Sequence, residues 1–217
     1  MRASTDSFDT VTRRPTQQRA RARFERILSE AETILREDGL QAFSIPVLAQ
    51  RLGYTRGSVY AYFPTPYALL GELAARHLAA LEAMFGEQRD ALRNVGWRAG
   101  IGLVADHASV FYNAHPVASL LLLGGGASDT SLRAQEETNK RLGDFIRGIW
   151  SQARALPVAP PDLTTLAADI GTAVFRRSWF EHGRITTPYR DAAVTAMVGF
   201  LEPYVQGAAR GAPRPSG

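Results

Sequence analysis

The stretch SIPVLAQRLGYTRGSVYAYF, residues 44–63, contains two short segments in which apolar residues recur with helical spacing. Gly53 separates the two segments, and a glycine permits the tight turn needed there. Ser44 and Thr55 each precede one segment as a candidate N-cap. Pro46 is tolerated because it falls in a first helical turn, where backbone amides lack partners. Two short helices joined by a glycine-containing turn predict a helix-turn-helix.

The same spacing predicts which side chains of this motif hold the helices together and which face solvent. The expected inward residues are Ile45, Leu48, Leu52 and Val59. The expected outward residues, the candidate DNA contacts, are Thr55, Arg56, Gly57, Ser58, Tyr60 and Tyr62, joined by the first N-cap, Ser44. Such a face suits a DNA major groove, because an arginine can bind a guanine edge or a phosphate and hydroxyls can bind either.

The rest of the chain also predicts helices. Apolar residues recur at intervals of three and four, and almost no segment alternates as a strand would. We predict an all-α fold of about nine helices. They are expected near residues 16–38, 44–52, 55–63, 66–92, 97–114, 116–123, 129–155, 162–182 and 188–206.

Composition excludes several classes of protein. The 217 residues are 45% hydrophobic and 21% charged, which is ordinary for a globular protein with a sizeable core. The sequence has no cysteine, which excludes disulfides, zinc fingers, iron–sulfur clusters and thiol nucleophiles. No run approaches the roughly 18–20 apolar residues of a membrane span, and the N-terminus lacks a secretory signal. A cytoplasmic protein without membrane contact is expected.

Positive charge gathers at the N-terminus. The net charge of the chain is +4, and residues 1–26 alone carry seven arginines against three acidic residues. Basic charge at one end favours contact with a polyanion. Arg19 and Arg23 are therefore further candidate DNA contacts, and the preceding arm could follow the DNA backbone or enter a minor groove. A solvated arm that touches nothing is the alternative.

The run Gly39–Leu70 resembles the DNA-binding domain of TetR-family transcriptional regulators. Those proteins carry a T/S-hydrophobic-x-x-hydrophobic-A motif, matched by Ser44–Ala49, and a G-hydrophobic-S/T-x-x-S/T-hydrophobic-Y-x-Y/H-F motif, matched by Gly53–Phe63. One departure is Pro66, since family members often place a phosphate-binding lysine there. That contact must be lost or supplied elsewhere in the chain.

The resemblance implies a regulator, most simply a repressor, that binds palindromic operator DNA as a homodimer and is released by a small, largely apolar molecule. It implies neither an enzyme nor a cofactor, and it places the dimer surface on the last two helices. The implied parts are a flexible basic arm (1–18), a helix-turn-helix DNA-binding domain (19–65), a ligand-binding and dimerisation domain (66–206) and a disordered tail (207–217).

The C-terminal half is dense in aromatic and histidine residues, which could line a largely apolar ligand pocket. The candidate ligand-binding residues are His107, Phe111, Tyr112, Leu122, Trp150, Phe175 and Trp179. Ordinary core packing is the alternative for each of them. No metal site is expected, because His107 and His115 lie just over two helical turns apart, too far for one ion.

Two other function classes stay open. One is a DNA-binding regulator with no small-molecule effector, and the other is an all-helical enzyme. The enzyme class lacks a nucleophile–base pattern, a carboxylate dyad or a cofactor motif in this sequence. A closed apolar cavity in the C-terminal half would favour the ligand-responsive regulator, whereas packing that leaves no void would favour a regulator without effector.

Overall fold

The fold is all-helical in a computed structural model that describes residues 12, 17–124, 129–150, 156 and 160–211. These residues contain ten α-helices, one short 3-10 helix and no β-strand, which confirms the predicted all-α class. The chain divides into two compact units, a smaller one up to Arg76 and a larger one from His77. The division lies inside α4 (Pro66–Glu87), beyond the predicted boundary after residue 65.

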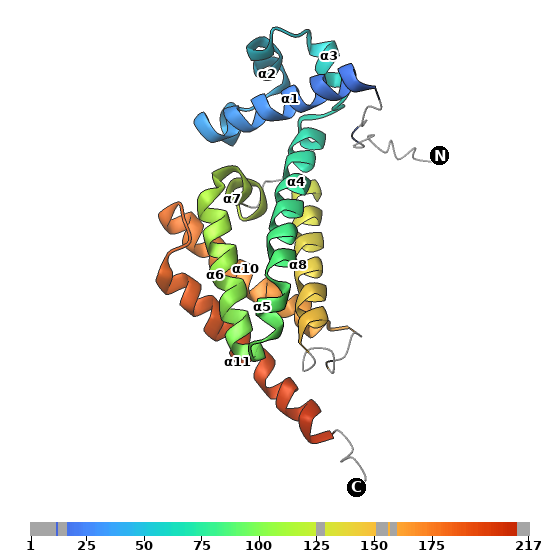
Figure 1. Ribbon diagram of the computed structural model, residues 1–217. Coiled ribbons are helices and arrows are strands. Elements are labelled where there is room, and N and C mark those ends of the chain that lie inside the picture. Colours follow the sequence, from blue (N-terminus) through green and yellow to red (C-terminus); the bar gives the residue numbers. More distant parts are fainter. Residues whose placement is uncertain (1–11, 13–16, 125–128, 151–155, 157–159, 212–217) are drawn as a thin grey trace, which may run out of the picture. The chain divides into compact units, whose positions relative to one another are not determined.

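The smaller unit is the helix-turn-helix. Its elements are α1 (Gln18–Glu37), η1 (Leu40–Ala42), α2 (Ile45–Leu52), α3 (Arg56–Tyr60) and the first turns of α4. Helix α2 packs against both α1 and α3 (Figure 1). The contact with α2 therefore holds α3 in place, although α3 is only five residues long.

Local hydrogen bonds fix the ends of α2 and α3 as predicted. The Ser44 hydroxyl accepts a hydrogen bond from the Val47 amide at 3.4 Å, and the Thr55 hydroxyl accepts one from the Ser58 amide at 3.2 Å. Between them, Gly53 has φ +66° and ψ 29°, a left-handed conformation that glycine adopts without strain. The predicted N-caps and the turn are confirmed.

Aromatic packing completes the core of the smaller unit. Phe63 is fully buried and stacks on Phe24 of α1, with ring centroids 4.9 Å apart. Val59, on the inner side of α3, is fully buried as well. The remaining core is the apolar stripe of α1 with the inner residues of α2 and α4: Ile27, Leu28, Ala31, Ile34, Leu35, Ile45, Leu48, Ala49, Leu69 and Leu73.

The larger unit is a bundle. Besides the end of α4, it contains α5 (Arg89–Arg93), α6 (Trp97–Ala114), α7 (Pro116–Leu122), α8 (Asp129–Ile149), α10 (Leu163–His182) and α11 (Thr187–Gly211). Helix α10 packs against α8 and α11, and α11 packs against α6 (Figure 1). The Met197 side chain of α11 packs directly on Gly171 of α10, where an added Cβ would lie 2.7 Å from the Met197 sulfur.

Two helices end earlier than predicted. Helix α3 stops at Tyr60, because the Tyr62 and Phe63 amides both bond the Val59 carbonyl and the chain turns there. The helix predicted over 66–92 breaks at Gln88, whose φ of −89° and ψ of 2° are not helical. This break lets α5 start in a new direction and bury Leu92 completely.

The ends of the chain lie largely beyond the described residues. Of the predicted arm, only Thr12, Gln17 and Gln18 are described, and Gln18 begins α1. Helix α11 continues to Gly211, into the segment predicted as a tail. Residues 151–155, predicted as the end of a helix, are also outside the described residues.

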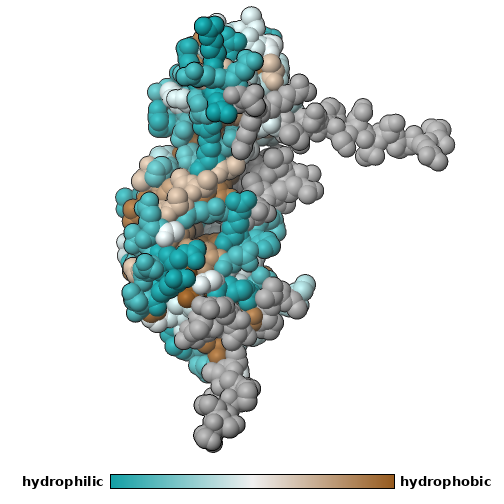
Figure 2. All heavy atoms as spheres, turned by 45° about the vertical axis from the view of Figure 1, so that its right-hand side comes forward, coloured by the Kyte–Doolittle hydropathy of each residue, from teal (hydrophilic) through white to brown (hydrophobic). Residues whose placement is uncertain are grey.

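The described surface is mainly polar. On the face in Figure 2, hydrophilic residues cover most of the area that is not grey, and apolar residues show only in small patches. Among the described helices, none combines the length and the apolar character needed to cross a membrane.

A partly buried ion pair joins the end of α8 to the start of α10. Arg147 donates to the Asp162 carboxylate at 2.7 Å and to the Leu156 carbonyl at 2.8 Å. The same carboxylate caps α10 by accepting from the Thr164 and Thr165 amides at 3.1 and 3.3 Å. Burial raises the pKa of Asp162, but these hydrogen bonds and the Arg147 charge outweigh burial and hold the pKa below its usual 3.8.

Two glycines of α6 give a matched test of this packing. An added Cβ at Gly100 would lie 1.9 Å from the Trp150 indole, whose Nε1 is held by the Leu92 carbonyl at 2.9 Å, whereas Gly102 has open space. Gly100→Ala should therefore lower the free energy of unfolding by about 1–3 kcal/mol through overpacking. Gly102→Ala should raise it by about 0.5–1 kcal/mol, because alanine loses less backbone entropy in a helix. Urea denaturation compares the two variants, and equal effects would contradict the contact with Trp150.

A second prediction concerns pH. Because the pKa of Asp162 is lowered on folding, its contribution to stability is present above the usual carboxyl pKa and is lost as the pH falls below it. Asp162→Asn keeps a good N-cap but removes the charge, and should cost about 1–2 kcal/mol at pH 7. Urea denaturation from pH 7 to 3 should show the two proteins converging below pH 4. A constant difference over that range would exclude the ion pair as its cause.

Candidate functional site

The outer side of α3 is solvent-exposed. Thr55, Arg56 and Gly57 are exposed, and Ser58 is half-buried. The Thr55 and Ser58 hydroxyls lie 2.9 Å apart and hydrogen-bond to each other. Arg56 makes no ion pair with any described residue. The helix thus presents two hydroxyls, one guanidinium and a glycine on one accessible face.

The two tyrosines at the end of α3 have different surroundings. Tyr60 is 44% exposed, so its ring and hydroxyl stand in solvent. Tyr62 is half-buried, and its ring meets Phe24 edge-on with centroids 6.0 Å apart. Tyr60 is available to a partner as a whole, whereas Tyr62 offers only its outer edge. Ser44, the first N-cap, is half-buried and keeps its hydroxyl on the α2 amide.

The carboxylates of α1 are held by arginines that lie on other helices. Arg76 of α4 binds both oxygens of Glu25 at 2.6 and 2.7 Å, and this hydrogen bonding holds the pKa of Glu25 below its usual range. Arg51 of α2 lies 3.3–3.5 Å from carboxylate oxygens of Glu30, Glu37 and Asp38. These four carboxylates are therefore paired within the unit.

Four arginines of the same unit keep their charge unpaired. Arg19, Arg23, Arg26 and Arg56 are all exposed and have no carboxylate partner among the described residues. Positive charge that no neighbour neutralises projects into solvent and attracts polyanions. The unit is thus electrostatically suited to bind a phosphate backbone.

Sequence analysis missed one element of this surface, the ring of Tyr54. Tyr54 lies in the turn before α3, and the guanidinium carbons of Arg23 and Arg26 lie 5.2 and 5.6 Å from its ring centroid. These cation–π contacts bring two arginines of α1 beside the start of α3. The i, i+3 spacing of the two arginines places them on one face of α1, but nothing in the sequence identifies the aromatic partner.

The larger unit contains a small apolar cavity, which we call the core cavity. It has a volume of about 30 Å³, room for about one to three water molecules. Helices α4, α6, α8, α10 and α11 all contribute to it. Its lining residues are Leu81, Phe85, Val104, Ala105, Ala108, Tyr112, Asn139, Leu142, Ala168, Gly171, Thr172, Phe175 and Met197.

Two of the seven predicted ligand-binding residues line this cavity. Tyr112 and Phe175 lie with their ring centroids 6.5 Å apart and nearly perpendicular planes. Burial strongly raises the pKa of the Tyr112 hydroxyl. The phenol therefore stays neutral.

The other five predicted residues lie elsewhere in the unit. The Trp150 indole is fixed on the Leu92 carbonyl, and Phe111 is buried against His115 with ring centroids 4.4 Å apart. The remaining three residues do not line the core cavity either. Leu122 of α7 is buried, and His107 and Trp179 are half-buried. The Nδ1 atom of His107 is buried and has no hydrogen-bond partner among the described atoms.

Polar residues of the cavity form a network that the sequence did not indicate. Asn139 is only 5% exposed, donates to the Asp169 carboxylate at 2.7 Å and accepts from the Thr172 hydroxyl at 3.0 Å. The network joins α8 to α10 at the wall of the cavity. Asn139 lies in a helix whose polar sequence predicted solvent exposure, so no periodic signal could have found it.

The described part of the chain contains no cluster of metal-binding side chains. Among the described residues, no group of three or more His, Asp or Glu side chains could hold an ion. Instead, the ring of His115 lies between two neighbours, stacked on Phe111 and edge-on to His77 at 6.3 Å.

Comparison with known proteins identifies the smaller unit. Residues 27–73 match the family model described as bacterial regulatory proteins, tetR family. This stretch contains the end of α1, all of α2 and α3, and the start of α4. No curated protein matches the sequence.

Most of the chain has the fold of solved TetR-family structures. FadR from Thermus thermophilus, a TetR-family transcriptional repressor in complex with lauroyl-CoA, is 19% identical, with a TM-score of 0.59 over 89% of this chain and 99% of that one. A TetR-family transcriptional regulator from Streptomyces coelicolor is 18% identical, with a TM-score of 0.56 over 83% and 98%. A TetR/AcrR-family regulator from Thermobifida fusca is 17% identical, with a TM-score of 0.53 over 89% and 100%.

Proposed function

We propose that this chain, whose N-terminal domain belongs to the tetR family of bacterial regulatory proteins, is a dimeric repressor that a small apolar effector releases from a palindromic operator. Helix α3 is the recognition helix. Its contacts are those predicted from the sequence, Ser44, Thr55, Arg56, Gly57, Ser58, Tyr60 and Tyr62, with Arg19 and Arg23 on the DNA backbone.

The observation that carries this proposal is the unpaired charge beside an exposed recognition face. Arg56 is exposed and has no carboxylate partner among the described residues, whereas Arg51 and Arg76 are each paired with carboxylates of α1. An arginine that is free in this way can bind a guanine edge with both of its terminal nitrogens. Arg23 and Arg26, held by Tyr54, supply phosphate contacts that the lysine absent at Pro66 would otherwise make.

A homodimer explains the apolar residues that α10 and α11 leave in solvent. Phe180 is 63% exposed, and Leu166 and Tyr204 are exposed too. Met197 and Leu201 of α11 are buried within the chain, so they are not part of the free face. Two copies that pair these helices would present two recognition helices to the two halves of a palindrome.

Effector control is a shift between two states of the dimer. A ligand that binds one spacing of the recognition helices better than another shifts the population toward that spacing. The packing of the bundle leaves an apolar void, the core cavity, and such a void favours the ligand-responsive class over a regulator without effector. At about 30 Å³ the cavity admits an effector only after its lining side chains move. An enzyme is disfavoured, since none of the polar groups of this cavity forms a nucleophile–base pair.

The first test is whether Arg56 reads DNA. Selection of duplexes from a random pool should return a palindromic operator for the wild-type chain. Arg56→Ala should then weaken operator binding by at least about tenfold, the worth of one good bidentate contact. Arg36→Ala removes the same charge from the far end of α1 and serves as the matched control. Equal affinities of both variants at fixed salt, with unchanged melting temperatures, would refute the role of Arg56.

The second test concerns Tyr54. Tyr54→Leu keeps an apolar side chain but removes the ring that orients Arg23 and Arg26, and should weaken operator binding by about three- to tenfold. Because no charge is lost, the dependence of log K on log salt should keep its slope. Arg26→Gln, in contrast, should reduce that slope by about one. Salt titrations that show the same slope change for both variants would argue against an orienting role.

A further inference from the structure

The turn between α10 and α11, residues 183–186, is held by a side chain of α6, and we call it the α10–α11 turn. The Asn113 amide nitrogen donates a hydrogen bond to the Ile185 carbonyl at 2.8 Å, and the Asn113 side-chain oxygen accepts one from the Ile185 amide at 2.8 Å. Asn113 thus pairs with one residue of the turn through both of its polar groups. Ile185 is only 4% exposed, so the turn is anchored on the bundle.

A serine of α10 holds the residues on either side of Ile185. The Ser178 hydroxyl donates to the Arg184 carbonyl at 2.9 Å and accepts from the Thr186 amide at 3.0 Å, and Ser178 is fully buried. Loops are usually more mobile than the helices they connect. In this turn, by contrast, two side chains bind four backbone groups.

A second contact from the same side of α6 reaches the first turn of α11. The Arg190 guanidinium forms an ion pair with the Asp106 carboxylate. Asp106 and Asn113 are seven positions apart, about two helical turns, so they lie on the same side of α6. Helix α6 therefore holds both the α10–α11 turn and the start of α11.

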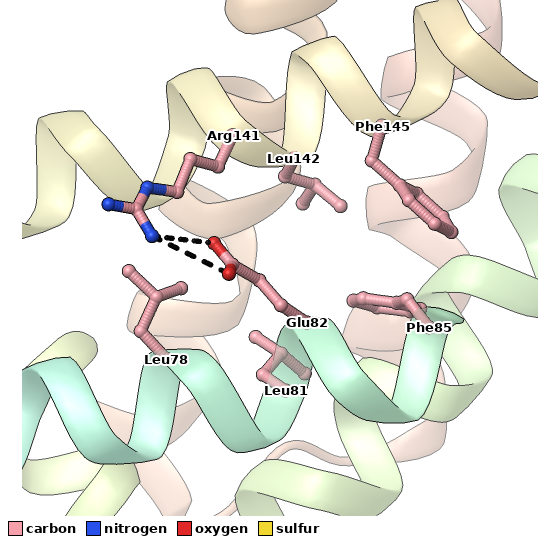
Figure 3. Close-up of a pocket in the computed structure, with 7 residues that line it drawn as sticks. All are labelled: Leu78, Leu81, Glu82, Phe85, Arg141, Leu142 and Phe145. Atoms are coloured by element: carbon pink, nitrogen blue, oxygen red, sulfur yellow. Dashed lines mark hydrogen bonds and ion pairs between the residues drawn. The ribbon is translucent and has the colours of Figure 1, made fainter. Parts of the chain in front are cut away.

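Other polar contacts between helices of the larger unit are less firmly held. Figure 3 shows Arg141 of α8 and Glu82 of α4 facing each other, with the Arg141 Nη1 atom 3.3 Å from a carboxylate oxygen. Both side chains are at least 39% exposed, and exposed ion pairs contribute little to stability. The Asn113 contact differs, because it binds the backbone of a buried residue through two hydrogen bonds at once.

The α10–α11 turn lies directly after the most exposed aromatic side chain of the proposed dimer face. Phe180, in the last turn of α10, is 63% exposed. It lies two residues after Ser178 and five before Ile185, so the chain is fixed on both sides of it. A large aromatic side chain on a rigid backbone suits the anchor of an interface, since less conformational freedom is lost on association.

From these contacts we infer that Asn113 is a positioning residue of the dimer, which fixes the α10–α11 turn so that Phe180 is presented to a second copy of the chain. The inference rests on the proposed function, because it assumes that α10 and α11 form the dimer face. Asn113 acts through the turn and needs no contact of its own with the second copy.

Sedimentation equilibrium of the full chain measures the dissociation constant of the dimer. Asn113→Ala should raise this constant at least about tenfold, because the two hydrogen bonds that hold the turn are lost. Asn113 is itself exposed, so the substitution leaves the core intact. Asn113→Asp is a second variant of nearly the same size. It should raise the constant too, because a carboxylate cannot donate to the Ile185 carbonyl.

Two control variants remove contacts that do not hold the α10–α11 turn. Ser119→Ala removes the buried hydrogen bond from the Ser119 hydroxyl to the Tyr112 carbonyl at 2.7 Å. It should lower the melting temperature and leave the dissociation constant of the dimer unchanged. Glu82→Gln weakens the exposed contact of Figure 3 and should change neither quantity. If Ser119→Ala weakens the dimer as much as Asn113→Ala, the effect is one of stability and the positioning role is wrong.

A double-mutant cycle with Phe180 separates positioning from general destabilisation. Phe180→Ala removes the exposed side chain and should itself weaken the dimer. If Asn113 acts by positioning Phe180, then Asn113→Ala should have a smaller effect in the Phe180→Ala chain than in the wild-type chain. Equal effects in the two chains would overturn the inference, because Asn113 would then act independently of Phe180.

Hydrogen exchange reports on the turn itself. The Ile185 amide should exchange faster in Asn113→Ala, which lacks its acceptor, while the amides inside α6 stay protected. A dimeric wild-type chain whose dissociation constant is unchanged in both Asn113 variants contradicts the positioning role and leaves the proposed dimer standing. A wild-type chain that stays monomeric overturns the proposed dimer and this inference together.

Discussion

The stack of Phe63 on Phe24 is the contact on which the recognition surface depends. Phe63 follows α3 directly and is fully buried, and Val59 is buried beside it on the inner side of α3. An aromatic pair of this kind contributes both buried area and a preferred geometry. Because one side of this very short helix is fixed in the core, the opposite side, with Arg56 and Tyr60, is left to solvent. The burial of one side of α3 thus both fixes the helix and leaves its opposite side accessible.

Charge is distributed within the smaller unit in a way that complements this geometry. Arg51 and Arg76 bind the carboxylates of α1, while Arg23 and Arg26 stack on Tyr54 instead of forming ion pairs. A guanidinium over an aromatic ring keeps its full charge and loses conformational freedom. The arginines with structural partners and those available to phosphate are therefore different residues, and binding DNA need not break the contacts that stabilise the unit.

The larger unit combines a tightly packed bundle with a small apolar space, the core cavity. The Trp150 indole lies directly against Gly100, and the Met197 side chain lies directly against Gly171. The core cavity is lined by side chains of five helices and holds no more than about one to three water molecules. A larger ligand must move these side chains, and the free energy of that rearrangement is what could distinguish two states of the bundle. The Asn139 network limits where such a ligand can end, since its polar atoms already bind each other.

The sequence by itself determined the features that arise from local interactions. The caps at Ser44 and Thr55 and the turn at Gly53 depend on residues a few positions apart, so their spacing predicted them correctly. Only the tertiary structure decided which distant side chains meet: Tyr54 with Arg23 and Arg26, Trp150 with Gly100, and Glu82 with Arg141. Of seven predicted ligand residues, it placed Tyr112 and Phe175 at the core cavity and the others elsewhere. The physical reason is that helical periodicity shows which face of a helix is buried, whereas the crossing of helices determines what that face contacts.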